Sequence, residues 1–156
     1  MPTIHLETRI KADIQICFDL SRSIDLHKIA TAKTKEIAVA GVTSGLIGLN
    51  ETVTWQAFHL GLKQRLTSVI TAFDSPHHFR DEQLKGIFHS FQHDHIFKQE
   101  RDCVLMIDDF TYRSPLGILG KIADALFLKK YLEGFLLERN NIIKSYAESD
   151  RWKTLL

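Results

Sequence analysis

The apolar residues of this chain change their spacing at Pro115, and this change constrains the fold more than any other feature. From residues 33 to 114 they mostly alternate with polar residues, which predicts strands buried on one face. From residues 116 to about 149 they recur every three or four residues, which predicts one helix about 45 Å long at 1.5 Å per residue. A helix of this length with a broad apolar stripe needs a large apolar surface, and the sheet is the candidate. The stripe comprises Leu119, Ile122, Ala123, Leu126, Phe127, Tyr131, Phe135, Ile142 and Tyr146. The opposite face is predicted to be solvated and to include Lys129, Lys130, Glu133, Glu138 and Arg139.

Turn-forming residues divide the alternating region into six strands. They are predicted over residues 34–40, 50–59, 62–73, 78–84, 87–99 and 103–114. A further alternating strand over residues 3–10 precedes two short helices, of which the first begins after Asp13 and the second spans residues 25–30. Short connections make neighbouring strands antiparallel, because a parallel pair needs a long crossover. The sequence therefore predicts an α+β domain with seven strands, two short helices after the first strand and a long C-terminal helix.

Length and charge exclude several classes of protein. The 156 residues correspond to one domain, residues 1–156. The 20 Lys and Arg residues nearly balance the 19 Asp and Glu residues, so the chain lacks the positive charge of a nucleic-acid binder. No signal peptide and no apolar run of bilayer length is visible, so we expect a cytoplasmic protein without membrane insertion. Cys17 and Cys103 are expected to be free thiols.

Three stretches resemble a known family: Thr54–Gly61 (TWQAFHLG), Phe79–Gly86 (FRDEQLKG) and Ser114–Gly120 (SPLGILG). With the order of elements, they make the whole chain similar to the START-like or SRPBCC superfamily, in its polyketide cyclase/dehydrase branch, and most similar to its small bacterial ligand-binding members. The resemblance implies the helix-grip fold, in which a curved seven-stranded antiparallel sheet wraps around the long helix and leaves an apolar cavity. It implies no particular reaction, because this fold hosts lipid carriers, hormone receptors, cyclases and hydrolases.

Alternation also predicts which side chains face the cavity. In the strand over residues 50–59, Trp55 and His59 belong to the more apolar set, which faces inward. If the two residues after His59 form a hairpin loop, His59 lies opposite Leu62 and Trp55 lies opposite Leu66. The inward residues of these two strands are then Val53, Trp55, Ala57, His59, Gln64, Leu66, Ser68, Ile70 and Ala72.

The last two predicted strands place a polar cluster on this apolar wall. Their inward faces are fixed by Phe91, Phe97, Met106, Phe110 and Tyr112. The inward residues have odd numbers on the first of these strands and even numbers on the second, so the numbers of two paired residues add up to an odd value. A sum of 201 places His95 opposite Met106 and His93 opposite Asp108. Phe79, Asp81 and Gln83 join the same wall, unless a bulge near Gly86 reverses the face of their strand.

The predicted function is binding of a small hydrophobic molecule, such as a lipid or polyketide-like compound, in a cavity of roughly 300–1,000 Å³. The candidate ligand contacts are Trp55, His59, Gln64, Leu66, Ile70, Phe79, Phe91, His93, His95, Asp108, Phe110, Tyr112 and Phe127. One alternative is a cyclase or dehydratase, a lyase or isomerase in which His93, His95 and Asp108 act as acid–base groups. Another is a protein-interaction module that uses the outer surface.

Two further expectations concern cofactors and assembly. A His-x-His pair on one strand face is a known metal-ligand arrangement, with Asp108 as a third ligand or an orienting group. No third clustered histidine or nearby cysteine accompanies it, so we predict neither a metal nor another cofactor. The sequence leaves both a monomer and a homodimer open, and a non-enzymatic binder is favoured over an enzyme.

Overall fold

The computed structural model describes residues 1–115 and 117–156, with residues 120 and 124 described in their backbone alone. Leu116, which belongs to the third stretch of the family resemblance, lies outside the described residues. The strands are β1 (Thr3–Ile10), β2 (Ile37–Gly41), β3 (Thr52–His59), β4 (Leu62–Asp74), β5 (His78–Lys85), β6 (Ser90–Gln99) and β7 (Val104–Arg113). The helices are α1 (Ile14–Ser21), α2 (Ile24–Ala30), α3 (Gly117–Ala123) and α4 (Lys129–Ala147), with a π-helical turn at Asp124–Leu128 and 3₁₀ turns at Ala32–Thr34 and Asp150–Thr154.

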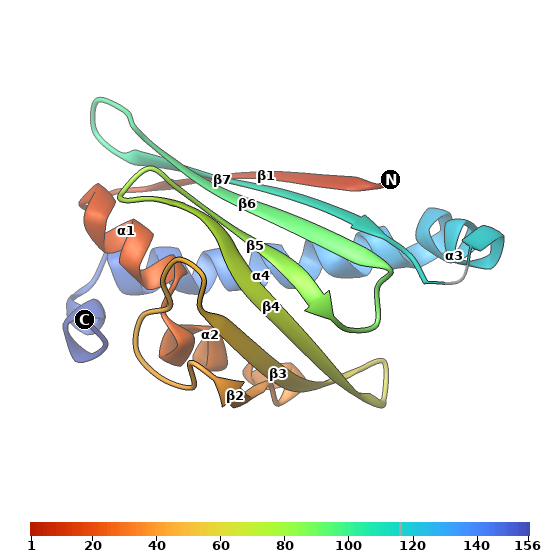
Figure 1. Cartoon of the computed structure of the whole chain (residues 1–156). Helices are drawn as coiled ribbons and strands as arrows, with labels where there is room; N and C mark the ends of the chain where they lie inside the picture. Colours follow the sequence, from red (N-terminus) through yellow and green to blue (C-terminus); the bar gives the residue numbers. More distant parts are fainter. Residues whose placement is uncertain (116) are drawn as a thin grey trace.

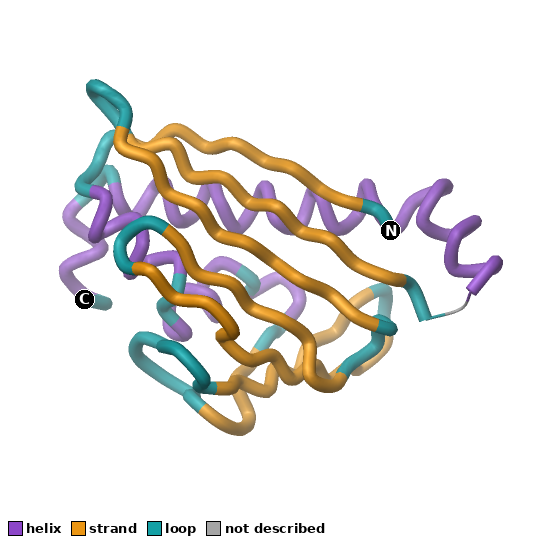
Figure 2. The backbone as a smooth tube through the Cα atoms, turned by 45° about the horizontal axis from the view of Figure 1, so that its top comes forward, coloured by secondary structure: helices purple, strands orange, loops and turns teal. Residues whose placement is uncertain are grey.

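The strands form one antiparallel sheet in the order β1-β7-β6-β5-β4-β3-β2, and the helices cover one of its faces (Figure 1). β1 and β2 lie at opposite edges, and α1 and α2 connect them. The continuous helix from α3 through α4 runs behind the sheet, as the second view also shows (Figure 2). This is the predicted α+β helix-grip arrangement, with two short helices after the first strand.

Local sequence explains where the short helices begin. The Asp13 carboxylate accepts hydrogen bonds from the backbone N–H groups of Gln15 and Ile16, at 2.8 and 3.3 Å, and so caps α1 as predicted. Ser23 caps α2 in the same way by accepting from the Leu26 N–H. The predicted strands begin and end within three residues of the observed ones.

Strand register was predicted correctly for one hairpin and wrongly for another. His59 pairs with Leu62 and Trp55 pairs with Leu66, as predicted. Between β6 and β7, however, paired residue numbers sum to 203, so His95 lies opposite Asp108. The cause is a four-residue loop closed by a 2.8 Å hydrogen bond from the Glu100 N–H to the Cys103 carbonyl. A shift of two keeps every side chain on its predicted face, because the side-chain period of a strand is two.

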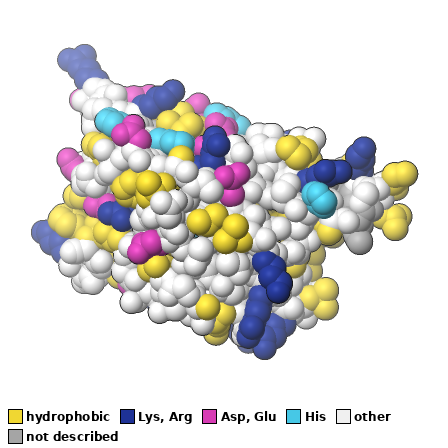
Figure 3. Space-filling view, in the orientation of Figure 1, with side chains coloured by type: hydrophobic (Ala, Val, Ile, Leu, Met, Phe, Trp, Pro, Cys, Tyr) yellow, Lys and Arg dark blue, Asp and Glu magenta, His cyan; other side chains and the backbone are white. Residues whose placement is uncertain are grey.

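The first turns of the C-terminal helix differ from the prediction. Phe127, predicted on the buried stripe, is 48 % exposed. The next residue, Leu128, packs against the buried cluster around Phe91, so the sheet reaches this turn and Phe127 is on a side of the helix that the sheet does not cover. α3 itself extends past the end of the sheet (Figures 1 and 2). Hydrophobic side chains are visible at that end of the molecule (Figure 3). The exposed apolar residues of this segment are Ile118, Leu119, Ile122, Leu126 and Phe127.

Arg139 is the second correction on this helix, because it is buried rather than solvated. Its exposed fraction is 5 %. The buried stripe of α4 runs through Leu136, Ile143 and Ala147, and Arg139 follows Leu136 by three residues, so it faces the sheet with them. The guanidinium thereby reaches the interior between helix and sheet.

Aromatic packing closes the sheet against α1. The Phe18 ring meets the rings of Phe73, Phe79 and Phe97 edge-on, with centroids 5.3–5.5 Å apart. A second buried cluster gathers Ile4, Phe91, Phe110, Tyr112 and Leu136 under the other part of α4. In the described part of the chain, no helix is both long and apolar enough to cross a membrane.

Candidate functional site

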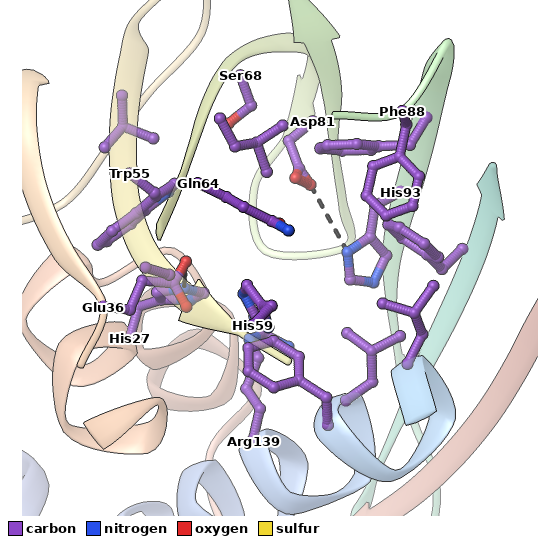
Figure 4. Close-up of a pocket in the computed structure, with 18 of the residues that line it drawn as sticks. His27, Glu36, Trp55, His59, Gln64, Ser68, Asp81, Phe88, His93 and Arg139 are labelled. Carbon is purple, nitrogen blue, oxygen red and sulfur yellow. Dashed lines mark ion pairs between the residues drawn. The ribbon is translucent and has the colours of Figure 1, made fainter. Parts of the chain in front are cut away.

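A cavity of about 220 Å³ lies between the sheet and α4. It is smaller than the predicted range, because side chains from α4 and from the loop before β6 fill part of the space that a bare sheet and helix would leave. Most of the predicted contact residues line it: Trp55, His59, Gln64, Leu66, Ile70, Phe79, Phe91, His93, His95 and Phe110. The close-up shows several of them converging on one space (Figure 4).

Three predicted contact residues lie outside the cavity wall. Asp108 has no exposed surface and lies behind the two histidines. Tyr112 is buried in the packing cluster around Phe91 and Phe110. Phe127 is about half exposed, as described above, and does not line the cavity.

Other residues line the cavity although the sequence did not predict them as ligand contacts. They are His27 from α2, Glu36 from the segment before β2, and Tyr131, Leu132, Phe135, Leu136 and Arg139 from α4. The spacing of Arg139 from Leu136 was an available signal, but its charge pointed to solvent. His27 lies in the predicted helix over residues 25–30 and Glu36 lies in the predicted strand over residues 34–40, but neither element was given an inward face from the sequence.

Asp108 is the centre of the buried polar cluster. Its Oδ1 lies 2.8 Å from His93 Nε2 and 3.2 Å from His95 Nδ1. Its Oδ2 accepts a 2.7 Å hydrogen bond from Asn140 Nδ2, and Arg139 Nη1 lies 3.6 Å from Oδ1. Two strands and α4 therefore converge on one carboxylate, which ties the helix to the sheet.

Asp81 faces the other side of the same histidine pair and borders the cavity. Its Oδ1 lies 3.3 Å from His95 Nε2 and 3.7 Å from His93 Nδ1. The two imidazole centroids are 3.8 Å apart. Each imidazole thus lies between a cavity-side carboxylate and a buried one. Figure 4 shows the pair of Asp81 and His93. Asp81 was predicted on this wall, and the strand that carries it is not reversed.

The charges of this cluster favour one proton on the histidine pair. Asp81, Asp108 and Arg139 sum to one negative charge, so a single imidazolium makes the cluster neutral. Burial acts to lower the pKa of His95, but hydrogen bonds to Asp108 and Asp81 outweigh it and raise that pKa. Burial and the neighbouring His95 lower the pKa of His93. Burial opposes ionisation of Asp108, yet the hydrogen bonds from both histidines hold its pKa well below the usual range.

A second polar group lies across the cavity from this cluster (Figure 4). Buried Glu36 has its Oε1 3.2 Å from His27 Nε2. Nearby, His59 Nδ1 and the Tyr131 hydroxyl are 2.8 Å apart. Among the described residues, Gln64 Oε1 is buried without a hydrogen-bond partner. This side of the cavity therefore offers acceptors for a hydrogen-bond donor.

A curved antiparallel sheet closed over a long C-terminal helix, with a cavity between them, is the helix-grip fold. Solved structures share it. The protein TTHA0849 from Thermus thermophilus superposes with a TM-score of 0.73 at 18 % identity, over 94 % of this chain and 99 % of that one. Ginseng major latex-like protein 151 from Panax ginseng gives 0.71 at 17 % identity, over 95 % and 98 %.

A third neighbour is StfQ, the di-domain ARO/CYC protein of the steffimycin biosynthetic pathway. It gives a TM-score of 0.73 at 12 % identity, over 94 % of this chain and 50 % of StfQ. No family model matches the sequence, and no curated protein matches it. At these identities the likeness shows the fold, and it agrees with the superfamily resemblance read from the sequence.

Proposed function

We propose that the protein binds a small, mostly apolar molecule with polar groups, inside the cavity between the sheet and α4. The observation that carries this proposal is an apolar cavity with a buried, charged cluster on one side and free acceptors on the other. Ligand sites typically combine apolar walls with a few placed polar groups. The place of the ARO/CYC neighbour StfQ in a biosynthetic pathway is compatible with it.

The two polar sides restrict the chemistry of the ligand. Both histidines already face Asp81 and Asp108, so Arg139 is the cavity-lining cation that favours a ligand oxygen carrying negative charge. Gln64 Oε1 and the Glu36 carboxylate favour a hydroxyl or amine that donates. At about 220 Å³, the space suits a compact molecule better than an extended lipid chain.

Native mass spectrometry of freshly purified protein tests whether a molecule co-purifies, and denaturing extraction identifies it. The proposal expects a mass excess that disappears on denaturation. As a defined probe we choose 1-naphthoate, a compact aromatic carboxylate, measured by calorimetric titration. Failure to bind 1-naphthoate, with no co-purifying molecule, would contradict the proposal.

A cavity-filling variant localises the binding. Ser68 is buried on the cavity wall of β4, whereas Thr71 is exposed on the other face of the same strand. Ser68→Phe should weaken 1-naphthoate binding at least about tenfold, because the new ring occupies the cavity. Thr71→Phe should bind like the wild type. Equal affinities for the two variants would place the binding elsewhere.

A cyclase or dehydratase, a lyase or isomerase, is the second candidate function. The observation that favours it is the 2.8 Å pair between His93, which lines the cavity, and the fully buried Asp108. Asp108→Asn separates the two functions. An enzyme would lose turnover of a polyketide-type substrate and keep its affinity, whereas a binder would show no turnover to lose.

A protein-interaction module is the third candidate function, and the exposed apolar residues of α3 would favour it. Nothing in the described part of the chain shows what covers them, so the cavity remains the better-supported site.

A further inference from the structure

We propose that Asp81, His93 and His95 bind a divalent first-row transition-metal ion of the zinc type at the wall of the cavity. This inference goes beyond the proposed function, because metal binding needs no organic ligand and is testable without one. The sequence pointed to the histidine pair, with Asp108 as either a third ligand or an orienting group, and predicted no metal. The structure assigns the position of the third ligand to Asp81 instead.

The three ligand atoms already have the spacing of a metal site. Asp81 Oδ1 lies 3.3 Å from His95 Nε2 and 3.7 Å from His93 Nδ1, and all three atoms lie within 4.8 Å of one another. In a tetrahedral zinc site with bonds of about 2.0–2.1 Å, neighbouring ligand atoms are about 3.3–3.4 Å apart. The edge between Asp81 and His95 already has this length, the edge between Asp81 and His93 must shorten by a few tenths of an ångström, and the edge between the two histidines is no longer than 4.8 Å before an ion draws it in.

The opposite ring nitrogens are held as metal-binding histidines require. His93 Nε2 and His95 Nδ1 both face Asp108 Oδ1, at 2.8 and 3.2 Å. A carboxylate behind a ligating histidine fixes its tautomer and turns the other nitrogen toward the metal. Asn140 in turn fixes Asp108 through a 2.7 Å hydrogen bond. One buried carboxylate thus orients His93 by a hydrogen bond and lies 3.2 Å from His95 Nδ1.

Burial and charge also fit a cation with an open coordination position. The two histidines are almost fully buried, and all three ligands border the cavity, so the remaining position faces the ligand space. Arg139 opposes a cation here, since it lies 3.6 Å from Asp108. With neutral histidines, Asp81, Asp108 and Arg139 leave one negative charge, and a divalent ion changes this to one positive charge. A ligand oxygen that carries negative charge would then make the site neutral.

Titration of the chelator-stripped full chain with Co²⁺, followed by competition with Zn²⁺, tests the proposal. We expect one Co²⁺ per chain, with the absorption spectrum of a four- or five-coordinate site, and its displacement by Zn²⁺. X-ray absorption of the wild-type zinc form should show two imidazoles. A spectrum of oxygen ligands alone, or no stoichiometric binding, would overturn the proposal whether or not the variants fold.

Variants assign the ligands. His93→Gln and Asp81→Asn should each weaken Co²⁺ binding more than about 100-fold, and Asp108→Asn about 10–100-fold. His78→Gln is the matched control, because His78 and Asp94 form a similar pair, 2.7 Å apart, that lies outside the cavity lining. It should bind Co²⁺ like the wild type. If folded His93→Gln binds Co²⁺ as tightly as the wild type, the metal site is refuted. Failure to bind 1-naphthoate would contradict the proposed function without contradicting the metal site.

Discussion

Asp108 shows how a single residue links the sheet to the helix. It is fully buried, and its carboxylate meets His93, His95 and Asn140 from two other elements. A buried charge is tolerated when all its partners are present, and removing one partner leaves an uncompensated charge. Alternation along β6 and β7 was sufficient to predict the inward faces of Asp108 and both histidines.

Asn140→Leu tests this role at the residue scale. The substitution removes the donor to Asp108 Oδ2, so we expect a loss of roughly 1–3 kcal/mol or more in the free energy of unfolding. The next residue supplies a matched control, because Asn141 is exposed on the same helix. Asn141→Leu should change stability by less than about 0.5 kcal/mol. Similar urea midpoints for the two variants would show that the hydrogen bond to Asp108 contributes little.

At the scale of elements, the C-terminal helix shows the limit of periodicity. A repeat of three and four residues predicts which side of a helix is apolar, but it does not say where the supporting sheet ends. Beyond that end, Leu119 and Ile122 of α3 continue the apolar pattern and are nevertheless exposed. Arg139 is the opposite case. It is charged, so the pattern of apolar residues predicts that it is exposed, yet it is buried and lines the cavity.

A pair of aspartate substitutions tests this placement of the helix. Ile143→Asp should destabilise the protein by at least about 3 kcal/mol, because Ile143 is 1 % exposed and the new carboxylate has no partner. Phe127→Asp should change stability by about 0.5 kcal/mol or less, as is usual for exposed positions. Thermal unfolding measures both, and comparable decreases in Tm would mean that Phe127 is covered.

The β6–β7 hairpin shows what was predictable about the site and what was not. Alternation identified the faces, but the number of loop residues depends on a backbone hydrogen bond from Glu100 that no side-chain pattern reports. The partners of the histidines changed accordingly, since His95 rather than His93 lies opposite Asp108. The place of Glu36 at the cavity was not predictable either, because tertiary packing alone brings its segment there.

At the scale of the whole molecule, the histidine pair makes stability depend on pH in two opposite ways. The pKa of His95 is raised above 6.5, so its contribution is fully present below pH 6.5 and is lost as pH rises through the folded-state pKa. The pKa of His93 is lowered below 6.5. Below pH 6.5 the unfolded chain therefore binds a proton that folded His93 does not, and stability falls as pH decreases.

Together the two histidines should contribute most to the stability of the metal-free protein near pH 6.5. At that pH one imidazolium balances the net negative charge of Asp81, Asp108 and Arg139. Urea unfolding of chelator-treated protein from about pH 5 to about pH 9 measures it, as the difference between wild type and variant. The wild type should lose stability as pH rises above 6.5, because His95 loses its proton. His95→Gln has no imidazolium to lose, so its free energy of unfolding should not show this decrease. His93→Gln should reduce the loss on the acid side, since the unfolded chain then has one fewer site that binds a proton. Parallel pH profiles for wild type and both variants would show that neither histidine has a pKa that changes on folding, and the one-proton description of the cluster would then be wrong.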